Sequence, residues 1–124
     1  MSIFVRIFSD MSTSREETLE REIEKTKQAL IKIGDLRPGS LSMQYNVCGR
    51  PGCRCKATPP EKHGPYYQVS FTRKGKSSSK FVKMKDLATV RRQLENYELM
   101  KQLMDRWIEL ATELSNLRLT QEGA

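Results

Sequence analysis

Four side chains that bind metal ions fall within a window of sixteen residues, which has the sequence CGRPGCRCKATPPEKH. The window holds every cysteine of the chain, Cys48, Cys53 and Cys55, and its single histidine, His63. Structural zinc sites use three cysteines and one histidine as the four donors of a tetrahedral ion. Glycine and proline between the donors allow the backbone to turn tightly. Residues 48–63, called the metal loop below, are therefore predicted to hold one structural Zn²⁺.

The cysteines have alternative interpretations on the sequence alone. They could be small buried apolar residues, a redox switch of low-pKa thiols in a basic setting, ligands of an iron–sulfur cluster, or part of a Cys–His catalytic pair. A zinc site with four protein ligands has no open position for a reacting water. Because the only histidine is used as a ligand and the acids lie mainly on solvent faces of helices, we expect no enzymatic activity.

Positive charge is concentrated in the middle of the chain. The formal net charge is +7, and residues 38–85 carry ten basic residues but a single acid, Glu61. Residues 1–36 carry six basic and seven acidic residues, and residues 86–124 carry five and seven. A local basic block on a balanced chain is typical of a surface that binds a polyanion. The alternative is a charged surface that only keeps the protein in solution.

Nucleic acid is the partner that this basic block predicts, and DNA is expected rather than RNA. Lysine and arginine would neutralise phosphates, the serines at 77–79 would add hydrogen bonds to phosphate, and Tyr66 or Tyr67 would stack on an unpaired base. The expected nucleic-acid contacts are Arg50, Arg54, Lys56, Lys62, Arg73, Lys74, Lys76, Lys80 and Lys83.

Alternating apolar and polar residues predict three strands within residues 37–85. Residues 41–47 fit a half-buried strand that leads into the metal loop, and residues 66–73 and 77–83 fit two more. The Lys74-Gly75 dipeptide between them indicates a tight hairpin turn. Phe81 is expected to point inward. The prediction is a small three-stranded antiparallel sheet whose first two strands are joined by the metal loop.

Helices are predicted on both sides of this sheet. Capping-box patterns at Thr13 and Ser14, followed by apolar residues at helical spacing, predict a helix over 13–34. Residues 1–12 are expected to be a short strand or a disordered segment. Residues 87–122 contain no proline or glycine, and an apolar stripe predicts a long helix over 86–120. The fold class is α+β, with the two helices forming a helical hairpin or coiled coil.

The long helix has more apolar surface than the small sheet can cover. We therefore expect it to pair with the first helix, with a second copy as a homodimer, or with a partner protein. This favours an alternative function, a zinc-stabilised interaction adaptor that dimerises through its long helix and binds no nucleic acid. Residues 13–124 are predicted to form a single domain, and a second core is not expected.

A cytoplasmic location is expected. The sequence has no apolar run long enough to span a membrane and no signal-peptide pattern. Thiols stay reduced in the cytoplasm, which favours clustered cysteines as metal ligands over disulfides.

The stretch LRPGSLSMQYNVCGRPGCRCKATPPEKHGPYYQVSFTRKGKSSSKFV resembles a family of small bacterial and archaeal proteins described only as a domain of unknown function. The resemblance rests on the turn at 37–41, the three cysteines and the HGPYY sequence at 63–67, and it covers about residues 36–115. It implies that the three cysteines and His63 act as one unit, and it implies no activity.

Overall fold

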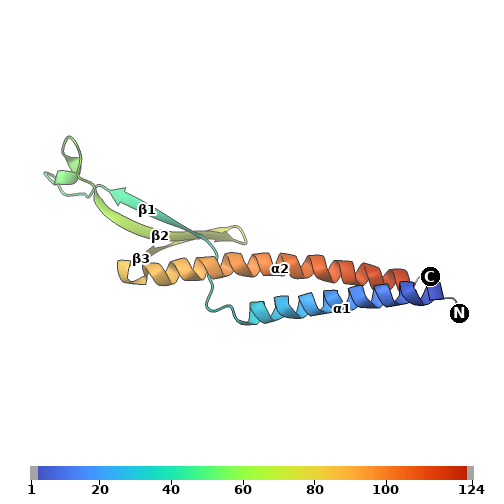
Figure 1. Cartoon of the computed structure of the whole chain (residues 1–124). Coiled ribbons are helices and arrows are strands. Elements are labelled where there is room, and N and C mark those ends of the chain that lie inside the picture. Colours follow the sequence, from blue (N-terminus) through green and yellow to red (C-terminus); the bar gives the residue numbers. More distant parts are fainter. Residues whose placement is uncertain (1–2, 123–124) are drawn as a thin grey trace. The chain divides into compact units, whose positions relative to one another are not determined.

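The computed structural model describes residues 3–122, with side chains for residues 14–120. The elements follow in the order α1 (Ile3–Ile31), β1 (Ser40–Asn46), η1 (Arg54–Lys56), β2 (His63–Arg73), β3 (Lys76–Val82), η2 (Met84–Asp86) and α2 (Leu87–Glu122) (Figure 1). The predicted α+β class is confirmed, with an N-terminal helix, a three-stranded antiparallel sheet and a long C-terminal helix. None of the described helices has both the length and the apolar character needed to cross a membrane.

Contacts divide the chain into two compact units. One contains the chain up to Ile33 together with Glu98 onward, and the other contains Gly34–Tyr97. Each unit has its own cluster of buried apolar side chains, so the expectation of one core is wrong. The prediction that residues 13–124 form a single domain stays a prediction.

The first unit is built from α1 and the C-terminal part of α2, which run side by side in opposite directions (Figure 1). Its core contains Leu19, Ile23, Leu110 and Leu114, with Trp107, Ala111 and Leu117 packed against it. Thr26 is buried in the same helix face, and its hydroxyl donates to the Glu22 carbonyl oxygen at 2.8 Å. Arg15 pairs with Glu113, and Arg118 pairs with Glu20, at exposed positions beside this core.

The N-terminal segment is helical from Ile3, so a strand or disorder over 3–12 is wrong. Residues 1 and 2 of that prediction lie outside the described residues. The apolar residues in this segment alternate only briefly, and neither glycine nor proline separates them from the following helix. The capping-box residues Thr13 and Ser14 therefore lie inside α1 and do not begin it.

The second unit holds the sheet, whose strands lie in the order β1-β2-β3. Residues directly opposite one another share a face of an antiparallel sheet, and Leu41 lies opposite Val69 while Tyr67 lies opposite Val82. These side chains form the packed face, which contacts Leu87, Val90 and Leu94 at the start of α2. Arg91 of the same helix lies over the Tyr67 ring at 6.0 Å from its centroid.

The other side of the sheet, called the open face, is mostly exposed and mostly polar. Hydroxyl and amide groups pair across its strands, with Ser70 and Ser79 at 2.9 Å and Thr72 and Ser77 at 2.8 Å between side-chain oxygens. The open face consists of Ser40, Ser42, Gln44, Tyr66, Gln68, Ser70, Thr72, Ser77, Ser79 and Phe81.

Phe81 lies on the open face and is 67% exposed, so its predicted inward orientation is wrong. The reason is the hairpin turn. Lys74 and Gly75 both have positive φ, at 52° and 76°, which is the two-residue turn that best fits the twist of a hairpin. This turn pairs Arg73 with Lys76, and counting along β3 from that pair places Val82, and not Phe81, on the packed face.

Candidate metal centre

The metal loop connects β1 to β2, and the sheet holds both of its ends together. His63 is the first residue of β2 and pairs with Asn46, the last residue of β1. Cys48 follows two positions after Asn46. The antiparallel pairing therefore places one predicted ligand, His63, at the start of β2 and another, Cys48, just after the end of β1. The remaining two predicted ligands lie in the loop between them.

All four predicted ligands come together. The sulfur atoms of the three cysteines and a ring nitrogen of His63 lie within 4.8 Å of one another. Cys53 Sγ lies 3.3 Å from His63 Nε2, and Cys48 Sγ lies 3.6 Å from Cys55 Sγ. Around a tetrahedral Zn²⁺ with its usual bond lengths, neighbouring donor atoms would be about 3.5–3.8 Å apart. The cluster can therefore hold a metal ion with little movement of the side chains.

Short backbone hydrogen bonds fold the loop around this cluster. The Cys53 carbonyl oxygen accepts from the Lys56 N–H at 3.0 Å, which forms the single turn η1. The Arg54 carbonyl oxygen accepts from both Ala57 and Glu61, at 3.0 and 2.9 Å, and so returns the chain toward β2. The turn places Cys55 at the centre of the loop, where it is 1% exposed.

Gly64 allows β2 to pass close to β1 directly after His63. Its φ is +143°, a region that L-residues avoid. A β-carbon at this position would lie 2.8 Å from the Gln44 carbonyl oxygen and 2.9 Å from a ring carbon of Tyr45. The position of His63 therefore depends on a glycine after it.

The pKa values of two of the thiols are shifted in opposite directions. The backbone N–H of Arg50, helped by the side chains of His63, Cys53 and Cys55, lowers the pKa of Cys48 from 9.0 to about 6. For Cys55 the backbone N–H of Cys48 acts to lower the pKa, but burial and the neighbouring Cys53 and Cys48 sulfurs outweigh it and raise the pKa above 9.0. The Cys48 thiolate is therefore available to a metal ion at neutral pH, whereas Cys55 must lose a proton when it binds.

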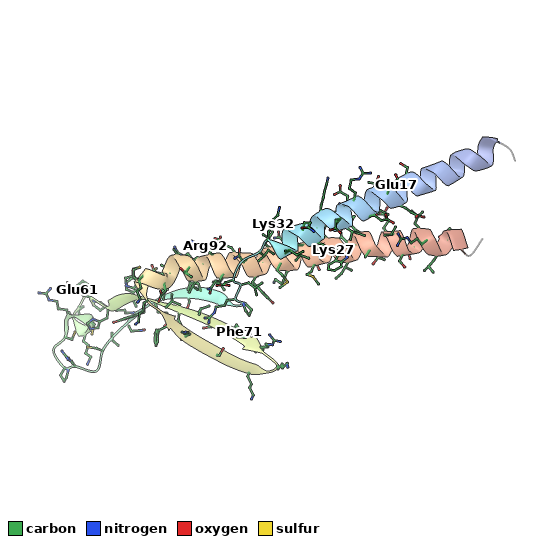
Figure 2. The ribbon with its side chains drawn as sticks, turned by 90° about the horizontal axis from the view of Figure 1, so that it is seen from below. Glu17, Lys27, Lys32, Glu61, Phe71 and Arg92 are labelled. Carbon is green, nitrogen blue, oxygen red and sulfur yellow. The ribbon has the colours of Figure 1, made fainter. Side chains whose placement is uncertain are left out.

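The predicted nucleic-acid contacts are exposed, but the structure does not bring them into one patch. Arg50, Arg54, Lys56 and Lys62 lie in the metal loop, whereas Arg73, Lys74 and Lys76 lie at the hairpin turn. These two groups are at opposite ends of β2, about 30 Å apart at the usual rise per strand residue. Figure 2 shows Glu61 in the loop beyond one end of the sheet and Phe71 toward the other end. Lys80 and Lys83 lie along and just after β3, between the two groups.

Almost none of this charge is neutralised within the protein. Among the residues 14–120, whose side chains the structure describes, one acid pairs with a basic residue of the 38–85 segment. It is Glu61, at 3.8 Å from Arg54, and both side chains are well exposed. The other basic residues of the segment are exposed and form no ion pair with any described side chain, so their charge faces solvent.

A cavity of about 540 Å³ lies beside the Cys3His cluster, the group formed by Cys48, Cys53, Cys55 and His63. Its lining includes Cys48 and His63 as well as Tyr66, Phe81 and Lys83. Its lining is mostly apolar, and several lining side chains are largely exposed: Val47, Tyr66, Phe81 and Met84.

The sequence analysis missed Phe81, Val47 and Met84 as exposed surface residues. The exposure of Phe81 could have been predicted from the Lys74-Gly75 turn, because a two-residue turn fixes the register of β3 against β2. Most of β1 is likewise exposed and not half-buried, with Met43 at 55% and Tyr45 at 49%. No sequence signal marks that difference, because an alternating strand looks the same whether one of its faces is covered or both are open.

Comparison with known proteins gives a family and no function. No curated protein and no solved structure matches the chain. A family model described as "Domain of unknown function (DUF6788)" matches residues 14–92, which is more than half of the chain. The match begins earlier and ends earlier than the predicted range of 36–115, and it includes the whole sheet and the metal loop. That other members share the cysteine and HGPYY sequences, or occur in bacteria and archaea, stays a prediction. The chain belongs to this family, a domain of unknown function.

Proposed function

We propose that this protein binds nucleic acid, DNA in particular, through a sheet that a structural Zn²⁺ stabilises. The zinc ion would be held by Cys48, Cys53, Cys55 and His63, whose donor atoms lie within 4.8 Å of one another. Three cysteines and one histidine form a borderline-soft donor set that suits Zn²⁺ better than Mg²⁺ or Ca²⁺. None of the three cysteines is in a disulfide, which fits a reducing compartment such as the cytoplasm.

The zinc ion would stabilise the fold and would take no part in a reaction. It would join the end of β1 to the start of β2 and fix the loop between them. A small sheet with few buried side chains gains most of its stability from such a cross-link. The basic residues of the loop would then project from a rigid support.

The observation that carries the proposal is unneutralised charge distributed along one sheet. Ten basic residues and one acid lie in residues 38–85, and among the described side chains one pair, Arg54 with Glu61, forms between them. The two groups of cations lie about 30 Å apart, at opposite ends of β2. A nucleic acid that runs along the sheet can therefore contact the metal loop and the hairpin turn together.

The test is a fluorescence anisotropy titration of the zinc-loaded protein with labelled duplex and single-stranded DNA at low salt. Binding should weaken steeply as salt rises, because counterions are released from phosphates. Replacing Arg73, Lys74 and Lys76 with Gln should weaken binding and reduce the slope of log K against log salt by about 2–3.

The matched control removes three exposed cations outside the sheet, Arg21 in α1, Lys32 just after α1 and Arg92 in α2, all to Gln (Lys32 and Arg92 are labelled in Figure 2). The control has the same net charge as the hairpin variant, so it should keep the parent affinity within about twofold if binding is localised. An absence of binding to either form of DNA at low salt would overturn the proposal. Equal losses in both variants would show that only net charge matters.

A second candidate function is an adaptor that dimerises through α2. Met104, Ile108 and Leu119 are 38%, 58% and 61% exposed, and their spacing places them on one side of the helix. A homodimer or a partner protein could bury this stripe. Sedimentation equilibrium tests it: the parent should be dimeric, and the Ile108→Lys variant should be monomeric. A monomeric parent at high concentration would rule out the homodimer.

A further inference from the structure

The cavity beside the metal cluster has the features of a site for a flat ring. Its volume of about 540 Å³ is within the range of small-molecule sites. Two exposed aromatic side chains, Tyr66 and Phe81, border it, and Lys83 lies next to them. Tyr66 is 43% exposed and Phe81 is 67% exposed, so both rings offer apolar surface to a ligand.

The sheet register fixes the relation between these two rings. Phe81 lies opposite Gln68, which is two positions along β2 from Tyr66, so the two aromatic residues are diagonal neighbours on the open face. Diagonal neighbours in an antiparallel sheet have β-carbons about 7–8 Å apart. That separation lets a planar group contact both rings.

We propose that an unpaired nucleobase occupies this cavity, stacked against Tyr66 and Phe81, while Lys83 contacts the phosphate beside it. This inference rests on the proposed nucleic-acid binding and specifies its form as single-stranded. Bases of any identity stack on exposed aromatic side chains, so little sequence preference is expected.

The surroundings of the cavity favour nucleic acid over a protein segment. The remainder of the open face is made of serine, threonine and glutamine, already paired across the strands, such as Gln44 with Gln68 at 3.1 Å. Such groups still have oxygen lone pairs and amide hydrogens for bases, sugars and phosphates. Unpaired cations lie at both ends of the sheet, so a strand that crosses the open face is held by opposite charge at each end.

The experiment compares a labelled oligothymidine of about twelve nucleotides with a duplex of similar length. The variants are Tyr66→Ala, Phe81→Ala and the double variant, with Phe81→Trp as a conservative replacement. Tyr45→Ala is the matched control, because Tyr45 is an aromatic ring of the same sheet, 49% exposed, that does not border the cavity. The zinc content and thermal unfolding of each variant establish that the fold is retained.

Each alanine replacement should weaken single-strand binding about fivefold or more, the usual loss for one base–aromatic stack. Duplex binding should change less than twofold, Phe81→Trp should keep the parent affinity, and Tyr45→Ala should have no effect. Photocrosslinking with 5-iodouracil in the oligonucleotide should label Tyr66 or Phe81.

Several outcomes separate this inference from the proposed function. If the parent binds DNA and the double variant binds single strands equally well, the stacking site is wrong and the basic surface stands. If the parent binds no DNA, the proposed function itself is wrong. Equal losses for single strands and duplex would also reject stacking of an unpaired base. Self-association of the parent that Phe81→Ala abolishes, with DNA binding unchanged, would assign the surface to a second copy.

Discussion

Cys53 and His63 are ten residues apart in the chain, and the sulfur of one lies 3.3 Å from Nε2 of the other. The contact depends on two features of the backbone. The η1 turn orients Cys53, and the pairing of Asn46 with His63 places the ring at the start of β2. The Cys3His cluster therefore depends on the loop and the sheet together, and its stability should respond to changes in either.

The metal content of the protein should fall when any of the four predicted ligands is replaced. We expect the purified protein to contain one zinc ion per chain by elemental analysis, and Cys53→Ser or His63→Ala to contain much less and to melt at a lower temperature. Thr58→Ala, in the same loop but without a ligand atom in the cluster, is the matched control. A metal-free parent with a cooperative melt would contradict the zinc site.

Metal affinity should rise with pH. In the metal-free protein the pKa of Cys55 is raised above 9.0, so at neutral pH this thiol holds a proton that metal binding must displace. Raising the pH toward 9 weakens that competition. Below about pH 6, Cys48 also takes up a proton and the affinity should fall more steeply. Competition with a chelator of known affinity, from pH 5.5 to 8.5, measures this, and a flat profile would refute it.

Gly64 should be intolerant of a side chain. Gly64→Ala places a β-carbon 2.8 Å from a backbone oxygen in a conformation that alanine avoids, and we expect a loss of about 1–3 kcal/mol in unfolding free energy together with weaker metal binding. Gly49→Ala, in the same loop with nothing within 4 Å of its added carbon, should change stability by less than about 0.5 kcal/mol. Urea unfolding of both variants makes the comparison. Equal effects would mean that the close approach of β2 to β1 is unimportant.

The two groups of cations should contribute independently to DNA binding. They lie about 30 Å apart, well beyond the distance at which substitutions usually interact. One variant changes Arg50, Lys56 and Lys62 to Gln and leaves the paired Arg54 intact, and the other changes Arg73, Lys74 and Lys76. We expect the free-energy losses of the two triple variants to add in the combined variant. A combined loss no larger than either single loss would show that DNA contacts only one end of the sheet.

The pairing of α1 with α2 should depend on the buried apolar residues of both helices and not on the exposed apolar stripe of α2 that contains Ile108. Leu19 is 1% exposed, and Leu19→Ala should cost about 2–5 kcal/mol because it leaves a cavity in the core. Ile108 is 58% exposed, and Ile108→Ala should cost less than about 0.5 kcal/mol in the monomer. Circular dichroism during urea unfolding monitors both. A large effect of Ile108→Ala that grows with protein concentration would instead support the dimer.

Local patterns in the sequence predicted those features of the structure that depend on residues close together in the chain. The four clustered side chains were predicted to lie together because cysteine and histidine occur nowhere else in the chain, and the hairpin was predicted from Lys74-Gly75. The extent of α2 was predicted because no residue interrupts it, and it ends at Glu122.

The parts that the sequence did not predict are decided by non-local contacts. The orientation of Phe81 depends on register, which is set by the turn, whereas hydrophobicity alone favours burial. The division into two units depends on which stretch of α2 meets α1 and which meets the sheet, and an uninterrupted apolar stripe contains no mark of that change. The distance between the two groups of cations follows from the length of β2, although both groups belong to one basic segment of the sequence.

The residue ranges of the two units also determine which unit can fold first during synthesis. The unit with the metal loop is continuous in sequence, from Gly34 to Tyr97, so its strands and its four predicted ligands are synthesised before the last part of α2. The other unit needs both ends of the chain, and Leu19 and Ile23 have no partners until Leu110 and Leu114 emerge. Metal capture can therefore precede helix pairing on the nascent chain, and the exposed apolar face of α1 is the part that a chaperone would shield in the interval.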